Sequence, residues 1–231
     1  MKRIGMALAA ASCLFATPAF AGVQVTTSSG TVNLAQNAST GIQFNGIGGN
    51  PVMVIPGLSS LLTLTYTGMT YLNNVSTFTF NYSIANQSSL SGSRVSSFGF
   101  DVNSTIATAS STGTFDYAAK GVNYPVGFGT VNVCFWDGPT GTCTGNGNGV
   151  TNGNTGNGTL TLTFNGLVND ITLSDFVDRY QGFDYQGIQS AIGVSTGVPE
   201  PGTWAIMILG FGMAGAAMRR RRHAVRLPAA A

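Results

Sequence analysis

The sequence predicts an all-β fold, an antiparallel β-sandwich of the jelly-roll kind, preceded by a signal peptide and followed by a single transmembrane helix. Apolar and hydroxyl-bearing residues alternate with a period of two along several segments, and no long stretch of the body has helical spacing. Only 8% of the 231 residues are charged, against about 25% in a typical soluble domain. Ser, Thr, Asn and 32 Gly take their place, which is typical of sheets with hydroxyl-rich and amide-rich outer faces.

The N-terminal segment, residues 1–21, has the order of a secretory signal peptide. A positively charged start precedes an apolar stretch, and a small-x-small cleavage site follows directly before Gly22. We therefore expect the Sec translocon and signal peptidase to act on the chain and to leave a mature body that begins at Gly22. The residues that support this are Lys2 and Arg3 at the start and Ala19 and Ala21 at the cleavage site.

The body, residues 22–197, reads as a series of half-buried strands. Strands separated by Ser/Gly/Asn loops, with no helices between them, favour antiparallel pairing in two packed sheets. A body of this length can build its own core. The expected inward-facing residues are Leu62, Leu64, Tyr66, Phe78, Phe80, Tyr82, Ile84, Phe98, Phe100, Val102, Val131, Val133, Phe135, Leu160, Leu162 and Phe164.

One run of the body, residues 145–158, has an unusual composition of six Gly and five Asn in fourteen residues. We predict a mobile or irregular surface loop here, because such a run is too flexible and polar to be buried. A calcium-binding turn array is the alternative. It would need carboxylates to balance the charge of the ion, and this run has none.

Two cysteines, Cys134 and Cys143, remain after removal of the signal peptide. The segment between them contains Asp-Gly-Pro and a further Gly, so the chain can turn back on itself. An even number of cysteines in an exported protein favours a disulfide over free thiols. Two thiols in a body without histidine fall short of a zinc shell, so no metal is expected there.

The charge of the body differs from that of the whole chain. Between residues 22 and 198 three basic residues face seven aspartates, which leaves a net charge of −4, whereas the other basic residues cluster at the two ends. A domain of this charge has no electrostatic footprint for a phosphate backbone. We therefore do not expect the body to bind nucleic acid.

The C-terminal segment opens with Pro-Glu-Pro, continues as an apolar run at residues 205–218 and ends in four consecutive arginines. The run is short for a membrane span, but a tryptophan at one interface and snorkelling arginines at the other make a thin crossing feasible. The run is apolar all round, so it is not a buried amphipathic helix. Arginines resist translocation, which places the body outside the inner membrane.

This tripartite order over residues 198–226 resembles the PEP-CTERM sorting signal in its PEPxxWA variant. The resemblance implies that exosortase, a membrane-embedded cysteine protease of Gram-negative bacteria, recognises the Pro-Glu-Pro region and releases the protein to the cell surface. It implies a recognition element of Pro199, Glu200, Pro201, Trp204 and Ala205. It implies a stop-transfer cluster of Arg219, Arg220, Arg221 and Arg222. A small tail, residues 227–231, follows the arginines and is longer than the signal requires.

A looser resemblance covers residues 94–181. The blocks at residues 94–102, 132–143 and 175–181 look like a PEP-CTERM surface-protein subgroup known as the cistern family. These blocks are structural motifs. The resemblance implies a sandwich with a single disulfide and carries no biochemical activity.

The polar and aromatic residues of the body supply the candidates for binding and catalysis. Aromatic rings on a sandwich face can stack on sugars, and the candidates are Trp136, Tyr180 and Tyr185, with Phe183 and Tyr124 beside them. Calcium could be held by some of Asp101, Asp116, Asp137, Asp175 and Asp178, although no Asp-x-Asp-x-Asp spacing supports it. The body has no His and no Glu, which removes His-dependent catalysis, and Asp175 with Asp178 is the one close carboxylate pair for glycoside hydrolysis.

The sequence therefore predicts an exported, non-enzymatic surface or extracellular-matrix protein without a cofactor. It would be anchored transiently in the inner membrane, processed by exosortase, and associated with extracellular polysaccharide. A secreted carbohydrate-binding module is the alternative, and a glycoside-active enzyme is a third, weaker one.

Overall fold

The computed structural model describes residues 22–27, 30–139, 142–145 and 148–195. This part of the chain is built from β-strands, and it contains no helix long and apolar enough to cross a membrane. The predicted all-β class is confirmed. The strands are β1 (Gly22–Thr27), β2 (Gly30–Leu34), β3 (Ser39–Gly48), β4 (Met53–Leu72), β5 (Val75–Asn86), β6 (Arg94–Val102), β7 (Thr108–Gly113), β8 (Tyr117–Tyr124), β9 (Gly129–Trp136), β10 (Val150–Thr151), β11 (Thr155–Asn165), β12 (Asp170–Tyr185) and β13 (Ile188–Ser195).

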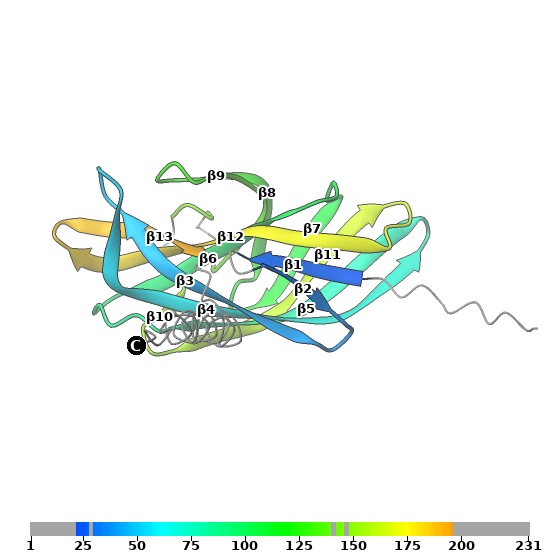
Figure 1. Ribbon diagram of the computed structural model, residues 1–231, viewed down its shortest axis with the longest axis horizontal. Coiled ribbons are helices and arrows are strands. Elements are labelled where there is room, and N and C mark those ends of the chain that lie inside the picture. Colours follow the sequence, from blue (N-terminus) through cyan, green and yellow to red (C-terminus); the bar gives the residue numbers. More distant parts are fainter. Residues whose placement is uncertain (1–21, 28–29, 140–141, 146–147, 196–231) are drawn as a thin grey trace, which may run out of the picture.

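The strands form one continuous sheet in the order β7-β11-β5-β4-β3-β13-β12-β6-β9-β8. Its pairs are antiparallel except for β1, which runs parallel to β12 and carries β2 on its other edge. β7 and β8 stand at opposite ends of this order, yet only residues 114–116 join them. The sheet therefore has to curve until its two ends meet, as the ribbon in Figure 1 shows, and the two predicted layers are parts of one nearly closed sheet.

The inner face of the curved sheet holds the main core. The predicted alternation is confirmed at residues 58–66 of β4, along β5 and at residues 160–164 of β11, where every second side chain is buried. Aromatic rings fill the centre: Phe98 lies 5.3 Å from Phe115 and 5.3 Å from Phe135, and Phe100 lies 5.2 Å from Phe176 (ring centroids). Such tilted and edge-on pairs add to the free energy gained from burial.

A second, smaller cluster lies on the outer face of part of the sheet. It contains Tyr124 and Val131 from the β8–β9 hairpin, Val177 from β12 and Ile192 from β13, together with both cysteines. Val131 was predicted to share a face with Val133 and Phe135, but it belongs to this outer cluster whereas the other two lie in the main core. The hairpin thus folds over the outer face of β12 and β13, above the sheet in Figure 1.

The Gly/Asn-rich run is more regular than predicted. Val150 and Thr151 form β10 on the edge of β6, and residues 155–158 pair with β5. Val150 is buried in the main core. The prediction of an irregular loop is therefore wrong for residues 150–151 and 155–158, because backbone pairing with β5 and β6 satisfies the polar groups that the small side chains leave bare.

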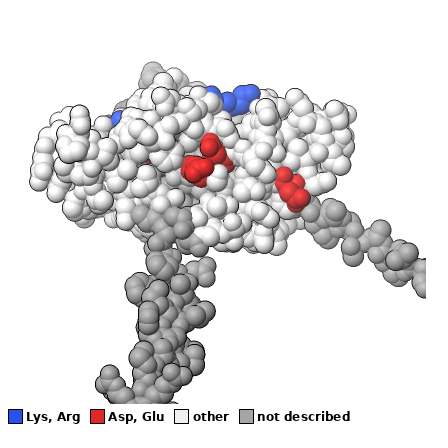
Figure 2. All heavy atoms as spheres, turned by 45° about the horizontal axis from the view of Figure 1, so that its top comes forward, with Lys and Arg blue, Asp and Glu red and all other residues white. Residues whose placement is uncertain are grey.

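The outer surface follows the composition. Figure 2 shows a face on which charged side chains are few and scattered. Elsewhere hydroxyl pairs cross between strands on exposed positions, such as Ser39 with Thr65 at 2.7 Å and Thr108 with Thr163 at 2.6 Å between oxygens. These are the cross-strand contacts expected of an outer face rich in Ser and Thr.

Candidate functional site

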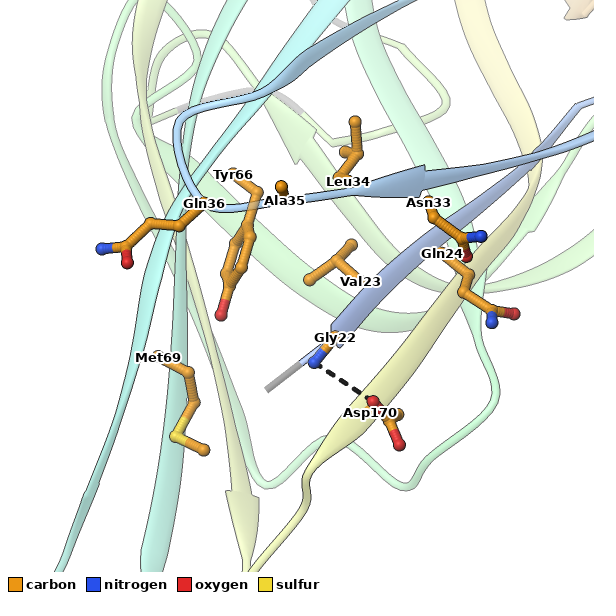
Figure 3. Close-up of a pocket in the computed structure, with 10 residues that line it drawn as sticks. All are labelled: Gly22, Val23, Gln24, Asn33, Leu34, Ala35, Gln36, Tyr66, Met69 and Asp170. Carbon is orange, nitrogen blue, oxygen red and sulfur yellow. Dashed lines mark hydrogen bonds between the residues drawn. The ribbon is translucent and has the colours of Figure 1, made fainter. Parts of the chain in front are cut away.

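A groove of about 860 Å³ opens beside Gly22, where β1, the end of β2, β4 and the start of β12 come together (Figure 3). Its walls are mostly uncharged: the amides of Gln24, Asn33 and Gln36 and the side chain of Met69 line it, and Asp170 supplies the one carboxylate. Burial raises the pKa of the Tyr66 phenol, whose ring reaches into the groove in Figure 3. Sequence reasoning missed this groove, because only the parallel pairing of β1 with β12 creates it.

The backbone nitrogen of Gly22 sits at the mouth of the groove between two acceptors. It donates to the carbonyl oxygen of Asn169 at 2.8 Å and to Oδ1 of Asp170 at 3.1 Å. A Cβ placed on Gly22 would lie 2.6 Å from that Oδ1, so a larger residue here would have to push the Asp170 carboxylate aside. Two hydrogen bonds of its backbone nitrogen therefore hold Gly22, the first residue after the predicted cleavage site, in place beside β12.

The predicted disulfide between Cys134 and Cys143 is present, with Cα atoms 6.1 Å apart. Both cysteines are buried in the outer cluster, and the Ser97 hydroxyl donates to the Cys143 carbonyl oxygen at 2.6 Å. The disulfide therefore ties the loop after β9 back to β9, and the Ser97 hydrogen bond holds this loop against β6.

Trp136, the first candidate for sugar stacking, is partly buried beside this disulfide. Its ring stacks on Tyr117 at 5.6 Å between centroids, and its Nε1 donates to the Gly138 carbonyl oxygen at 3.0 Å. Part of the ring pair remains exposed. Two carboxylates, Asp116 and Asp137, lie near it, and burial, followed by the repulsion of Asp116, raises the pKa of Asp137.

The other aromatic candidates are mostly core residues. Tyr180 has no exposed surface and donates its hydroxyl to Ser60 Oγ at 2.9 Å, so the prediction that it stacks on a sugar is wrong. Phe183 and Tyr124 are buried as well, and Tyr185 is partly buried against the main core. Tyr180 and Phe183 lie in the main core, whereas Tyr124 is buried in the outer cluster. Trp136 alone keeps the predicted position beside the disulfide loop.

Asp178 is the most unusual titratable group of the described residues. It is fully buried next to Tyr180, and its Oδ2 accepts a hydrogen bond from the Ser60 hydroxyl, whereas Oδ1 lacks a partner of ordinary geometry. Burial raises the pKa of Asp178 to about 7, and the Ser60 and Tyr180 hydroxyls and the approaching Gly193 amide lower it in part. The sequence marks Asp178 as a calcium candidate and as half of a carboxylate pair but does not predict its burial, because the partners that cover it lie far away in the chain.

The predicted pair of Asp175 and Asp178 is not brought together. Asp175 lies at a bulge of β12 with a φ of 49° and is exposed, whereas Asp178 points into the core. A buried carboxyl group cannot reach a glycosidic bond, so the pair does not have the arrangement that glycoside hydrolysis needs. Among the described residues no three His, Cys, Asp or Glu side chains gather to hold a metal ion, so no three of the calcium candidates come together there.

The chain leaves the fold from a central strand. β13 ends at Ser195 and is hydrogen-bonded on both sides, to β3 through Ser195 and Phe44 and to β12 through Val194 and Val177. The predicted recognition residues 199–205 and stop-transfer residues 219–222 lie outside the described residues, as do Ala19 and Ala21. The last described strand therefore ends two positions before residue 197, where the matched motif described next begins.

The family profile of the PEP-CTERM protein-sorting motif matches residues 197–222. The chain carries a PEP-CTERM protein-sorting motif. The motif implies export to the cell envelope or surface of a Gram-negative bacterium, with exosortase as the processing partner. No curated protein and no solved structure matches the chain.

The PEP-CTERM match contains all nine residues predicted for recognition and stop-transfer. It begins one residue before the predicted start at 198 and ends at 222, four residues before the predicted end at 226. The PEPxxWA variant and the cistern subgroup stay predictions. The body that the PEP-CTERM motif follows is the nearly closed sheet described above.

Proposed function

We propose that this protein is a non-enzymatic component of the cell surface or extracellular matrix, anchored briefly in the inner membrane through its C-terminal signal and associated with extracellular polysaccharide after exosortase processing. The PEP-CTERM motif at residues 197–222 carries the proposal. Its position supports it further, because β13, the last strand of the described residues, ends at Ser195, before the motif begins at residue 197.

Removal of the signal leaves the fold intact under this proposal. Ser195 is paired inside the sheet, and four peptide links separate it from Pro199, a span of at most about 14 Å. Cleavage beyond this tether leaves every described strand uncut and removes none of the described core residues. The body is therefore released folded, which a matrix component requires.

The test is the mass of the protein recovered from the cell surface and medium. We expect the wild-type chain to begin at Gly22 and to lack the apolar segment, residues 205–218, and the arginines after it. Pro201→Ala should leave a longer precursor in the inner membrane, because exosortase loses part of its recognition element. Pro228→Ala, outside the matched motif, is the control and should be processed normally. Exported protein that still carries residues 205–231 would overturn the proposal.

A second candidate function, polysaccharide binding, rests on the partly exposed stack of Trp136 on Tyr117. Stacked rings beside carboxylates are suited to sugar rings and their hydroxyls. Processed protein should then bind extracellular polysaccharide saturably, and Trp136→Ala should weaken binding while Tyr71→Ala, an exposed tyrosine at the β4–β5 tip, should not. Equal binding by both variants would remove this candidate and leave the export proposal untouched.

A further inference from the structure

The Gly22 nitrogen lies against the Asn169 carbonyl and the Asp170 carboxylate. Its capacity to donate hydrogen bonds to these two groups changes when the signal peptide is cut. In the uncut chain the nitrogen is an amide with a single hydrogen, and two oxygen acceptors lie within 3.1 Å of it. A single N–H cannot make a full hydrogen bond to both oxygens, so part of their accepting capacity is unfilled in the uncut chain. Figure 3 shows the Asp170 carboxylate turned toward this nitrogen.

We propose that Asp170 and the Asn169 carbonyl form a receptor for the new α-ammonium group of Gly22, so that signal-peptide cleavage itself fastens β1 to β12. The proposal rests on cleavage before Gly22, which is part of the export route proposed above. It assigns to Asp170, at the first position of β12, a role that neither the sorting motif nor the sheet requires.

The chemistry of the cut supplies what the site lacks. Hydrolysis breaks the bond between the Ala21 carbonyl carbon and the Gly22 nitrogen. The oxygen of water goes to Ala21, which leaves as a carboxylate with the signal peptide, and both hydrogens go to the nitrogen. The Gly22 amide with one hydrogen becomes an ammonium with three and gains a positive charge. Two of the three hydrogens then meet the acceptors already in place, one of them a charged carboxylate.

The surroundings of Asp170 favour this partner. Of the three basic residues of the body, Lys120 donates to the carbonyl oxygens of Ile106 and Ala107, and Arg179 is buried in the middle of β12. Arg94 lies in β6. None of the three lines the groove at Gly22, so no side-chain cation of the described residues competes there with the new ammonium for Asp170.

The glycine at position 22 and the parallel register make the fit specific. Gly22 pairs with Asp170 in the first step of the β1–β12 ladder, so the terminal nitrogen falls beside the first residues of β12. A side chain at position 22 would displace the carboxylate. Cleavage one residue earlier or later would place the charge outside the reach of Asp170.

The test compares two chains in detergent, residues 22–231 and residues 21–231, each with Asp170 or with Asp170→Asn. In the first chain the Gly22 nitrogen is an ammonium, and in the second it is an amide. We expect Asp170→Asn to lower the Tm by about 1–3 °C in the chain that begins at Gly22, the size of an exposed ion pair in a domain of this length. In the chain that begins at Ala21 the same substitution should shift the Tm by less than half as much, since asparagine still accepts from an amide. Equal shifts in both chains would overturn the proposal.

A second readout does not depend on stability. The α-ammonium of Gly22, followed by NMR through pH, should titrate about one unit above the ordinary value of 7.7–8.0 in the chain with Asp170. Asp170→Asn should return it to the ordinary value, and an unchanged titration would contradict the receptor. Because the chains are made with defined starts, these results stand apart from where the cell cuts. An exported protein that does not begin at Gly22 would instead contradict the export route.

Discussion

Two regions of the same sheet differ in whether their outer face is covered by other parts of the chain. In the one-sided region, β4, β5 and β11, buried side chains alternate with partly exposed ones, so only the inner face is covered. In the two-sided region, β6, β9, β12 and β13, runs of consecutive residues are buried, such as residues 176–180 and 191–193. The β8–β9 hairpin and the disulfide loop cover the second face there.

This difference decides where the fold can hold buried charge and where it needs glycine. The two buried charged residues of the described part, Asp178 and Arg179, are neighbours in the two-sided region and point to opposite faces. Burial lowers the pKa of Arg179, as it raises that of Asp178. A Cβ on Gly193 would lie 1.9 Å from Oδ1 of Asp178, so β13 passes the carboxyl group only as glycine. A strand that is covered on both faces therefore tolerates fewer changes of side-chain size and charge than a strand that is covered on one face.

The largest effect expected from this comparison is the pH dependence set by Asp178. Its pKa in the folded protein, about 7, exceeds the ordinary 3.8, so the folded state holds the proton more tightly than the unfolded state. The stabilisation is complete below pH 3.8 and is lost as the pH rises through 7. The free energy of unfolding should fall over this window by on the order of 4 kcal/mol. Urea denaturation at a series of pH values measures it.

Asp178→Asn isolates this contribution, because asparagine keeps the shape and loses the charge. Burial also raises the pKa values of Asp101 and Asp137, so a smaller slope of the same sign should persist in the variant. Asp184→Asn, an exposed change, is the control and should keep the wild-type slope. If Asp178→Asn kept the full slope, the buried carboxyl group would not be its source.

The next effect separates the two outer faces directly. Ile192 on β13 is 1% exposed in the outer cluster, so Ile192→Ala should cost about 2–4 kcal/mol through lost burial and a cavity. Thr161 on the outer face of β11 is partly exposed, and Thr161→Ala should change the free energy of unfolding by less than about 0.5 kcal/mol. Chemical denaturation of both variants gives the comparison. Similar costs at the two sites would show that the hairpin does not cover β13 in solution.

The same difference explains which parts of the structure the sequence could predict. In the one-sided region local alternation carries the information, and residues such as Phe78 and Leu162 lie inside as predicted. In the two-sided region the cover comes from residues far away in the chain, so alternation misplaced Val131 and left Tyr180 as a surface candidate. The disulfide was predictable because composition and spacing alone suggest it, and the sorting motif because it is linear. The Gly22–Asp170 contact joins residues 148 positions apart and has no local signal.

The smallest effect concerns hydroxyl groups rather than apolar side chains. In the two-sided region the Ser97 hydroxyl is buried, donates to the Cys143 carbonyl oxygen and lies 3.1 Å from the Tyr124 hydroxyl. Ser97→Ala leaves both groups without this partner in a place that water does not reach, which should cost about 1–2 kcal/mol. Thermal and urea denaturation of the oxidised protein measure the loss.

The matched change in the one-sided region is Thr65→Val, which removes a hydroxyl bonded to Ser39 at 2.7 Å on an exposed face. Water replaces the lost partner there, and valine suits a strand at least as well as threonine, so we expect a change of less than about 0.5 kcal/mol. The pair of variants compares one hydroxyl under the hairpin with one in contact with solvent. If Thr65→Val cost as much as Ser97→Ala, hydroxyl pairing itself would stabilise this sheet, and the difference between its regions would lie in apolar packing alone.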